Sequence, residues 1–344
     1  MNNEIYPPLM GVVKGIFEMK FSAIKHKIKN NPGLKSLKEI KEAGYRIAKE
    51  RDGDRYFLAR QEELKPLLVR LGDIAEVKFG IKTGANEFFY LDEERLKEWK
   101  IEKEFLKPII KSPRECKSIL IKASDLKFKV FMCHKDKKDL KGTNALKYIE
   151  WGEESKKDTE GKEIGQFHKR PSCRGRQKWW ECPELKGNMF WVKETNDRLG
   201  AFISKEFMLC DCRLYYTDGS IGLQNSYNST LTALISEVLS RVGLGEGAKS
   251  LMVYEVNDML VLNPSVMKST QFLMSARELK SIFTELGINP NLPIRDQKPN
   301  PLPDRKTLDD VVFDIIGLTQ EERDEMYWAV CELVKNRLEK ARSV

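Results

Sequence analysis

The sequence predicts an α+β protein, and three observations lead to this fold class. Apolar residues recur at helical spacing near both ends of the chain, short β-like runs alternate with polar loops between them, and a proline-rich segment precedes the last helices. At 344 residues the chain is long enough for two or three domains. We therefore expect a helical N-terminal segment (1–54), a mixed α/β domain (55–288), a proline-rich linker (289–305) and a C-terminal helical unit (306–344).

The N-terminal segment is predicted to end in a helix over residues 36–50, SLKEIKEAGYRIAKE. Leu37, Ile40, Ala43 and Ile47 follow one another at three- and four-residue intervals, and Ser36 is a suitable cap. The Asp-Gly-Asp triplet at 52–54 then breaks the pattern.

The mixed domain is predicted from short apolar runs. Strands are expected at 56–58, 74–79 and 88–91, with a glycine turn at 82–86 and a charged helix over 92–100. Further strands are expected at 118–121 and 130–132. Residues 151–169 are poor in apolar side chains and are predicted to be mobile.

The last third of the chain is predicted to be helical. Residues 229–242 have the pattern of an amphipathic helix that stops at Gly243. Five prolines in residues 289–305 predict an extended linker. A helical face with Leu308, Val311, Val312 and Ile315 follows, and a final helix over 319–342 opens with a Thr319–Glu322 capping pattern.

Charge and cysteine content limit the classes of partner and compartment. Sixty basic against fifty-two acidic residues give a net charge of +8, which favours a polyanionic partner. No apolar run is long enough to span a bilayer, and the N-terminus lacks the features of a signal peptide, so a cytoplasmic protein without a membrane partner is expected. Seven cysteines, an odd number without even spacing, are expected to be free thiols.

The most informative stretch is residues 169–180, KRPSCRGRQKWW. It contains five basic residues, no acid and two adjacent tryptophans, which could stack on an unpaired base or wedge beside a base step. The alternative is a solvated basic loop that the tryptophans anchor to the core. The basic and aromatic residues are Lys169, Arg170, Arg174, Arg176, Lys178, Trp179 and Trp180.

A second stretch, residues 80–86 (GIKTGAN), has two glycines four positions apart that allow a close backbone approach. Lys82, Thr83 and Asn86 could donate to phosphate. A plain hairpin turn is the alternative, and residues 243–250 (GLGEGAKS) are likewise more typical of a helix end and turn than of a phosphate loop.

Metal binding and catalysis have weaker support. Cys173, Cys182, Cys210 and Cys212, with His168, are spaced unlike a zinc knuckle. The carboxylate-x-lysine triplets at Glu115 and Glu160 resemble half of a nuclease metal site, a pattern that is common by chance in a charged sequence.

Taken in order, several short motifs resemble the C-terminal specificity region of TaqI-like and type IIG adenine-specific DNA methyltransferases of restriction-modification systems. The resemblance covers roughly residues 55–344. The motifs are LGDIAEV (71–77), GIKTGANEFFYL (80–91), FLKPIIKS (105–112), the 170–180 loop, YNST (227–230), residues 243–264, GLTQEER (317–323) and RLEKA (337–341).

The catalytic motifs of that family are not found in the sequence. Its glycine-rich S-adenosylmethionine loop and its Asn-Pro-Pro-Tyr motif have no counterpart, since Tyr6-Pro7-Pro8-Leu9 keeps only the two prolines. The resemblance therefore implies a DNA target-recognition part without the methylation chemistry. It implies double-stranded DNA and a methyltransferase catalytic part as partners, with no cofactor on this chain and S-adenosylmethionine on that part. The open alternatives are a docking subunit for a separate methyltransferase and a fused nuclease.

Overall fold

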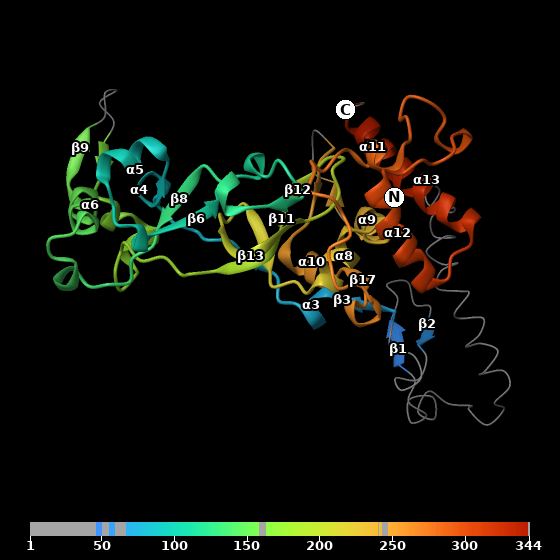
Figure 1. Cartoon of the computed structure of the whole chain (residues 1–344), viewed down its shortest axis with the longest axis horizontal. Helices are drawn as coiled ribbons and strands as arrows, with labels where there is room; N and C mark the ends of the chain where they lie inside the picture. The colour runs from blue at the N-terminus through green and yellow to red at the C-terminus, as the bar shows by residue number, and fades with distance from the viewer. Residues whose placement is uncertain are drawn as a thin grey trace.

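The protein is elongated, with a mixed β-sheet that runs between two ends rich in helices (Figure 1). It is seen in a computed structural model that describes residues 46–49, 55–58, 67–157, 163–239, 241–242 and 247–342. The predicted α+β class is confirmed. Within these residues, no helix has the length and apolar content needed to cross a membrane.

The described helices are mostly short, apart from the two at the C-terminus. They are α3 (Leu71–Ile74), α4 (Asn86–Phe89), α5 (Glu93–Trp99), α6 (Asn144–Glu153), α7 (Pro171–Arg174), α8 (Ile221–Asn228), α9 (Thr230–Leu239), α10 (Val253–Asp258), α11 (Ile282–Leu286), α12 (Pro303–Ile316) and α13 (Gln320–Arg342).

One eight-stranded sheet forms the centre, in the order β4-β14-β11-β13-β6-β8-β5, with β7 also paired to β13. Its strands are antiparallel except where β13 pairs with β6 and β7. The strands of this sheet are β4 (Lys78–Phe79), β5 (Tyr90–Leu91), β6 (Leu106–Ile110), β7 (Leu120–Ile121), β8 (Phe128–Phe131), β11 (Lys186–Val192), β13 (Phe202–Cys210) and β14 (Leu214–Thr217).

The remaining strands form small sheets. Four antiparallel groupings hold them: β1 with β2, β9 with β10, β17 with β3, and β16 between β12 and β15. Their bounds are β1 (Arg46–Lys49), β2 (Arg55–Leu58), β3 (Leu68–Arg70), β9 (Ser155–Lys157), β10 (Glu163–Gly165), β12 (Glu194–Thr195), β15 (Arg241–Val242), β16 (Lys249–Ser250) and β17 (Leu260–Leu262).

Two lobes with separate cores stand on the central sheet. The aromatic lobe is built around α4, α5, α6 and α7, and its core contains Phe88, Phe131, Tyr148 and Trp179. The helical lobe is built around α8, α9, α12 and α13, and its core extends from Leu71 to Val334. Each lobe therefore buries its own apolar surface, and the sheet joins the two.

Both lobes stand on the same face of the sheet. Leu209 lies opposite Ile109 in the aromatic lobe's core, and Tyr215 lies opposite Trp191 in the helical lobe's core. The sequence neighbours of these four residues belong instead to a third apolar cluster. These neighbours are Cys210, Ile110, Tyr216 and Phe190. Because side chains alternate between the faces of a strand, that third cluster covers the opposite face.

Several predicted elements are confirmed and others need correction. The helix predicted over 92–100 is α5, which Asp92 caps through the Arg95 amide at 3.0 Å and which ends at Lys100 in the left-handed region (φ 49°). The strand predicted at 56–58 is part of β2. The helix predicted over 36–50 is wrong at its end, because residues 46–49 pair with 55–58 as a hairpin; its earlier residues lie outside the described part.

The strands predicted at 74–79 and 88–91 are wrong in their first halves. Residues 71–74 form α3, which packs on α10, and only Lys78 and Phe79 are in a strand. Phe88 and Phe89 are both fully buried within α4. A half-buried strand would point consecutive side chains to opposite faces, whereas a helical turn inside a core can bury both.

Two predictions in the remaining chain have mixed outcomes. The helix predicted over 229–242 ends at Leu239, because Arg241 and Val242 pair with β16. In the segment predicted to be mobile, residues 151–153 end α6 and residues 155–157 pair with 163–165; 158–162 lie outside the described part.

The proline-rich segment predicted as a linker is held firmly against the helical lobe. Ile294 is buried, and the amides of Asn300 and Leu302 donate to the carbonyls of Leu286 and Glu285, both at 2.9 Å. Helix α12 begins inside the segment, at Pro303. The helices before and after the segment share one core.

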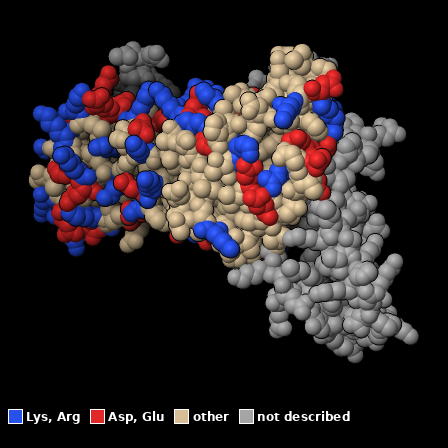
Figure 2. All heavy atoms as spheres, turned by 45° about the vertical axis from the view of Figure 1, so that its right-hand side comes forward, with Lys and Arg blue, Asp and Glu red and all other residues tan. Residues whose placement is uncertain are grey.

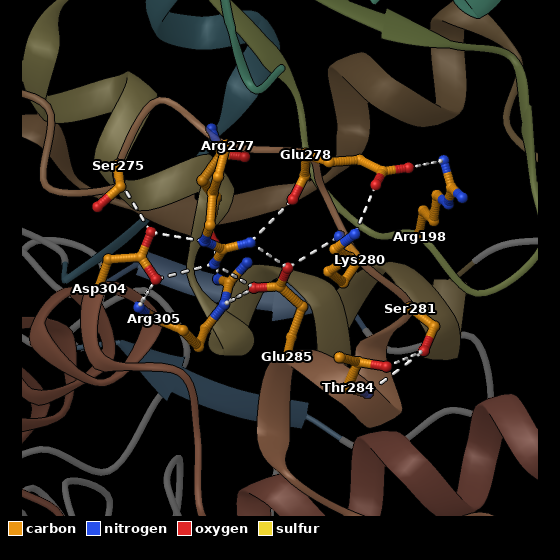
Figure 3. Close-up of polar contacts among 11 residues, drawn as sticks. Arg198, Ser275, Arg277, Glu278, Lys280, Ser281, Thr284, Glu285, Asp304 and Arg305 are labelled. Carbon is orange, nitrogen blue, oxygen red and sulfur yellow. Dashed lines mark hydrogen bonds and ion pairs between the residues drawn. The ribbon is translucent and has the colours of Figure 1, made fainter. Parts of the chain in front are cut away.

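An ion-pair network fixes the start of α12 (Figure 3). Glu285, only 1% exposed, accepts from Arg277 at 2.7 and 2.8 Å and from Arg305 at 3.3 Å. Asp304 accepts from Arg277 at 2.8 and 2.9 Å. Buried charges are tolerated when they are paired in this way, so the network stabilises the join between α11 and α12.

Candidate nucleic-acid interface

The two stretches that the sequence singled out lie against each other, although almost ninety positions separate them. Arg176 donates from its guanidinium to the carbonyl of Lys82 at 3.1 Å and to that of Thr83 at 2.6 Å. It also donates to the carbonyl of Glu181 at 3.1 Å. Arg176 therefore ties the basic loop to the glycine turn, and its donors are directed at the protein's own backbone.

The glycines of the turn allow it to approach the protein's own chain. A Cβ on Gly80 would lie 2.3 Å from the carbonyl oxygen of Cys210, and one on Gly84 would lie 2.4 Å from the Cβ of Ser172. Gly84 also has a φ of +76°, which disfavours any other residue. The close approach inferred from the glycines is therefore present, with β13 and α7 as the neighbours.

The three predicted donors of the turn differ in exposure. Thr83 is 2% exposed, and its hydroxyl donates to Asn86 and accepts from the Ala85 amide, so it serves the turn itself. Lys82 and Asn86 are exposed. Of the three, Lys82 and Asn86 remain available to a ligand.

The basic side chains of the loop also divide into two groups. Arg170 pairs with Glu87 at 2.9 Å, and Lys178, only 19% exposed, pairs with Asp136 at 3.2 Å. Lys169 and Arg174 are exposed, and in the described part of the chain no acidic side chain holds either of them. The cations that a phosphate can reach are thus Lys82, Lys169 and Arg174.

The two tryptophans anchor the loop to the core of the aromatic lobe. Trp179 is 7% and Trp180 8% exposed. The Trp179 indole donates to Glu153 at 2.8 Å, and its ring lies 4.6 Å from that of Phe88. Neither tryptophan presents a ring face to a base, so the anchoring alternative is the one that the structure supports.

A second group of cations, which sequence reasoning missed, lies at the turn between β13 and β14. Asp211, 2% exposed, accepts from the Tyr90 hydroxyl at 2.6 Å and from Arg213 at 2.8 Å. Arg213 follows Cys212, whose amide donates to the carbonyl of Ile81 at 3.0 Å, and Lys82 follows Ile81; Lys193 follows Val192, the strand partner of Leu214. These residues are far apart in the sequence and follow no motif, so only the sheet register brings them together.

The charges of the aromatic lobe are not all of one sign. Figure 2 shows Lys and Arg interspersed with Asp and Glu at this end of the molecule, whereas the rest of the displayed surface carries fewer charges. The candidate interface is therefore a local group of cations, and its position matters more than the net charge.

The other candidate sites are not assembled. In the described ranges, no three His, Cys, Asp or Glu side chains are grouped so as to hold a metal ion. Cys173, Cys182 and Cys210 are buried free thiols, and burial raises the pKa of Cys182 to about 12. Glu160 lies outside the described residues. Lys249 of the 243–250 stretch is turned inward, 3.0 Å from Glu237.

The family of the chain follows from comparison with known proteins. Residues 57–297 match the family model described as the C-terminal domain of the type II methyltransferase M.Eco57I, and the chain belongs to this family. The C-terminal methyltransferase region that the motifs resembled is thereby confirmed. No curated protein matches the chain.

A solved structure shares the fold. The chain is similar to the type IIG restriction endonuclease BpuSI, with a TM-score of 0.54 and 13% sequence identity. The match covers 82% of this chain and 32% of that chain. This protein thus spans about a third of the restriction enzyme that it resembles.

Proposed function

We propose that this chain binds double-stranded DNA as the target-recognition part of an adenine-N6 methyltransferase of a restriction-modification system. Membership of a type II methyltransferase C-terminal family supports this function. The observation that carries it is the joining of the 80–86 turn and the 169–180 loop, which leaves Lys82, Lys169 and Arg174 exposed together on a rigid base.

The physical reason for such a part is the cost of base flipping. A methyltransferase must move its adenine out of the duplex, and unstacking costs a few kcal/mol. Contacts to the backbone on a second domain offset that cost and fix the register of the enzyme on the duplex. S-adenosylmethionine and the methylation chemistry would belong to the catalytic part, and DNA as the substrate is consistent with a cytoplasmic protein.

A salt titration of duplex binding tests the proposal. Fluorescence anisotropy with a labelled duplex should show binding at low salt that weakens by about 0.9 in log K per log unit of salt for each phosphate contacted. Lys82→Ala should reduce that slope by about one such contact. Lys141→Ala, at an exposed lysine of the aromatic lobe far from the joined segments in sequence, is a control and should leave the slope unchanged. No binding at low salt would remove the function.

A second function, docking to a methyltransferase catalytic part, has its own support. Ile74 of α3 is 42% exposed, and Met252 and Tyr254, at the start of α10, are 48% and 54% exposed. Helices α3 and α10 pack together, so that a Cβ on Gly72 would lie 3.0 Å from that of Asn257. Exposed apolar side chains on two helices packed together make this surface a candidate protein interface.

A further inference from the structure

Phe79 is an aromatic side chain of the central sheet that is partly exposed to solvent. It lies on the two-residue edge strand β4 and is 46% exposed. The Tyr215 ring meets it edge-on at 5.0 Å, and the Lys193 ammonium lies 4.7 Å from its centroid. The ring is therefore held in place from two sides while nearly half of its surface faces solvent.

The sheet register places cations on the same face as Phe79. Tyr215 is paired with Phe79 in β4–β14, and Val192 is paired with Leu214 in β11–β14. The residues one step beyond that last pair are Lys193 and Arg213, which alternation puts on the side of Tyr215. Lys82 follows Ile81, whose carbonyl accepts from the Cys212 amide next to Arg213 at 3.0 Å.

The positive charge of this group is only partly neutralised. Asp211 faces this group with its carboxylate already engaged by the Tyr90 hydroxyl and by Arg213, and Glu255 of α10 lies near Tyr215. The Arg213 side chain nevertheless keeps 52% of its surface exposed. Glu76, the other acid near β4, is paired with Lys78 at 2.8 Å.

An exposed ring bordered by cations has the chemistry of a site for an unstacked base and its phosphates. Bases stack on aromatic side chains regardless of sequence, while the cations contact the backbone. We propose that Phe79, with Lys82, Lys193 and Arg213, contacts DNA where a base has left the stack. This inference rests on the proposed function and adds to it a preference for a disrupted base step.

The test compares two duplexes that differ in one feature. Anisotropy titrations at low salt would use a fully paired duplex and the same duplex with one unpaired base at its centre. The wild-type chain should prefer the second duplex, and Phe79→Leu should reduce that preference about five- to tenfold while Phe79→Trp retains it. Leu292→Ala, at a 51% exposed apolar side chain of the proline-rich segment, is the control and should change neither affinity.

The lysine beside the ring gives an independent readout. Lys193→Gln should weaken binding to both duplexes by a similar factor and lower the salt dependence, because a phosphate contact does not distinguish them. Thermal unfolding of each variant confirms that the surface substitutions leave the fold intact.

The outcomes separate this inference from the proposed function. Wild-type binding without any preference for the unpaired base, or a preference that Phe79→Leu leaves unchanged, would overturn the stacking site and leave duplex binding standing. If Phe79→Leu keeps its DNA binding but loses affinity for a methyltransferase catalytic part, Phe79 is a protein contact. This outcome would also overturn the stacking site. If the chain binds neither duplex, both the stacking site and the proposed DNA-binding function are wrong.

Discussion

Arg174 and Arg176 stand two positions apart in one loop, yet they have different surroundings. Arg174 is exposed, whereas Arg176 is directed at three backbone carbonyls. Arg174→Ala should weaken DNA binding by about 1–3 kcal/mol at unchanged thermal stability. Arg176→Ala should instead lower the free energy of unfolding by on the order of 2 kcal/mol, since it removes charged hydrogen bonds. Anisotropy measures the effect of Arg174→Ala on DNA binding, and urea unfolding measures the effect of Arg176→Ala on stability. Undiminished binding in Arg174→Ala would show that the loop faces away from DNA.

Glu285 gives the fold a defined response to acid. Burial alone would raise the pKa of Glu285, but hydrogen bonds from Arg277 and the charge of Arg305 hold it below its ordinary value of 4.5. The pKa of Asp304 is likewise lowered, mainly by Arg277 acting against burial. A carboxyl with a lowered folded pKa stabilises above its unfolded pKa and loses that contribution as pH falls through the folded value.

Glu285→Gln should therefore cost about 3–5 kcal/mol at neutral pH, because it leaves Arg277 and Arg305 without their shared carboxylate. The variant should also lose less stability than the wild type between pH 4.5 and more acidic values. Urea unfolding at several pH values measures both effects. Glu339→Gln, at an exposed glutamate of α13, is the control; a wild-type stability that is flat below pH 4.5 would contradict the assignment.

At the scale of elements, the sequence predicted those helices and strands whose ends depend on neighbouring residues. Helix α5 was predictable because Asp92 and Lys100 mark its ends in the sequence. Strand β13 was not predicted, because its parallel pairing with β6 joins residues about a hundred positions apart. The joined 80–86 and 169–180 stretches were each identified, but their contact depends on Arg176 and Ser172 meeting a distant turn.

The glycine turn is an element whose conformation can be tested directly. Gly80→Ala would place a methyl group 2.3 Å from the Cys210 carbonyl oxygen and 2.4 Å from that of Asp211, and this backbone leaves it no room. We expect a loss of on the order of 2–4 kcal/mol of stability, together with weaker DNA binding. Gly175→Ala is the matched control, since nothing lies within 4 Å of its Cβ and it adopts a helical conformation. Equal stability of the two variants would show that the turn can move away from β13.

At the scale of the whole molecule, the two lobes divide the proposed tasks. The exposed cations of the 80–86 and 169–180 segments lie on the aromatic lobe, whereas the apolar side chains of α3 and α10 lie on the helical lobe. Because both lobes stand on one face of the sheet, a ligand that bridges them would cross Phe79, Lys193 and Arg213. The arrangement allows DNA and a catalytic part to be held at the same time.

Ile74→Glu combined with Met252→Glu tests this division. Two carboxylates placed among exposed apolar side chains should weaken association with a methyltransferase catalytic part at least about tenfold, because desolvating them in an interface is unfavourable. DNA binding by the isolated chain should fall by a smaller factor than this association, because the added carboxylates act on DNA phosphates only through solvent-screened charge, although Met252 follows Leu251, whose amide donates to the Lys193 carbonyl. Val238→Glu, at a 42% exposed valine of α9, controls for the added charge. Analytical ultracentrifugation measures the association and anisotropy the DNA binding; a double variant that loses DNA affinity but keeps the catalytic part would reverse the assignment of the two lobes.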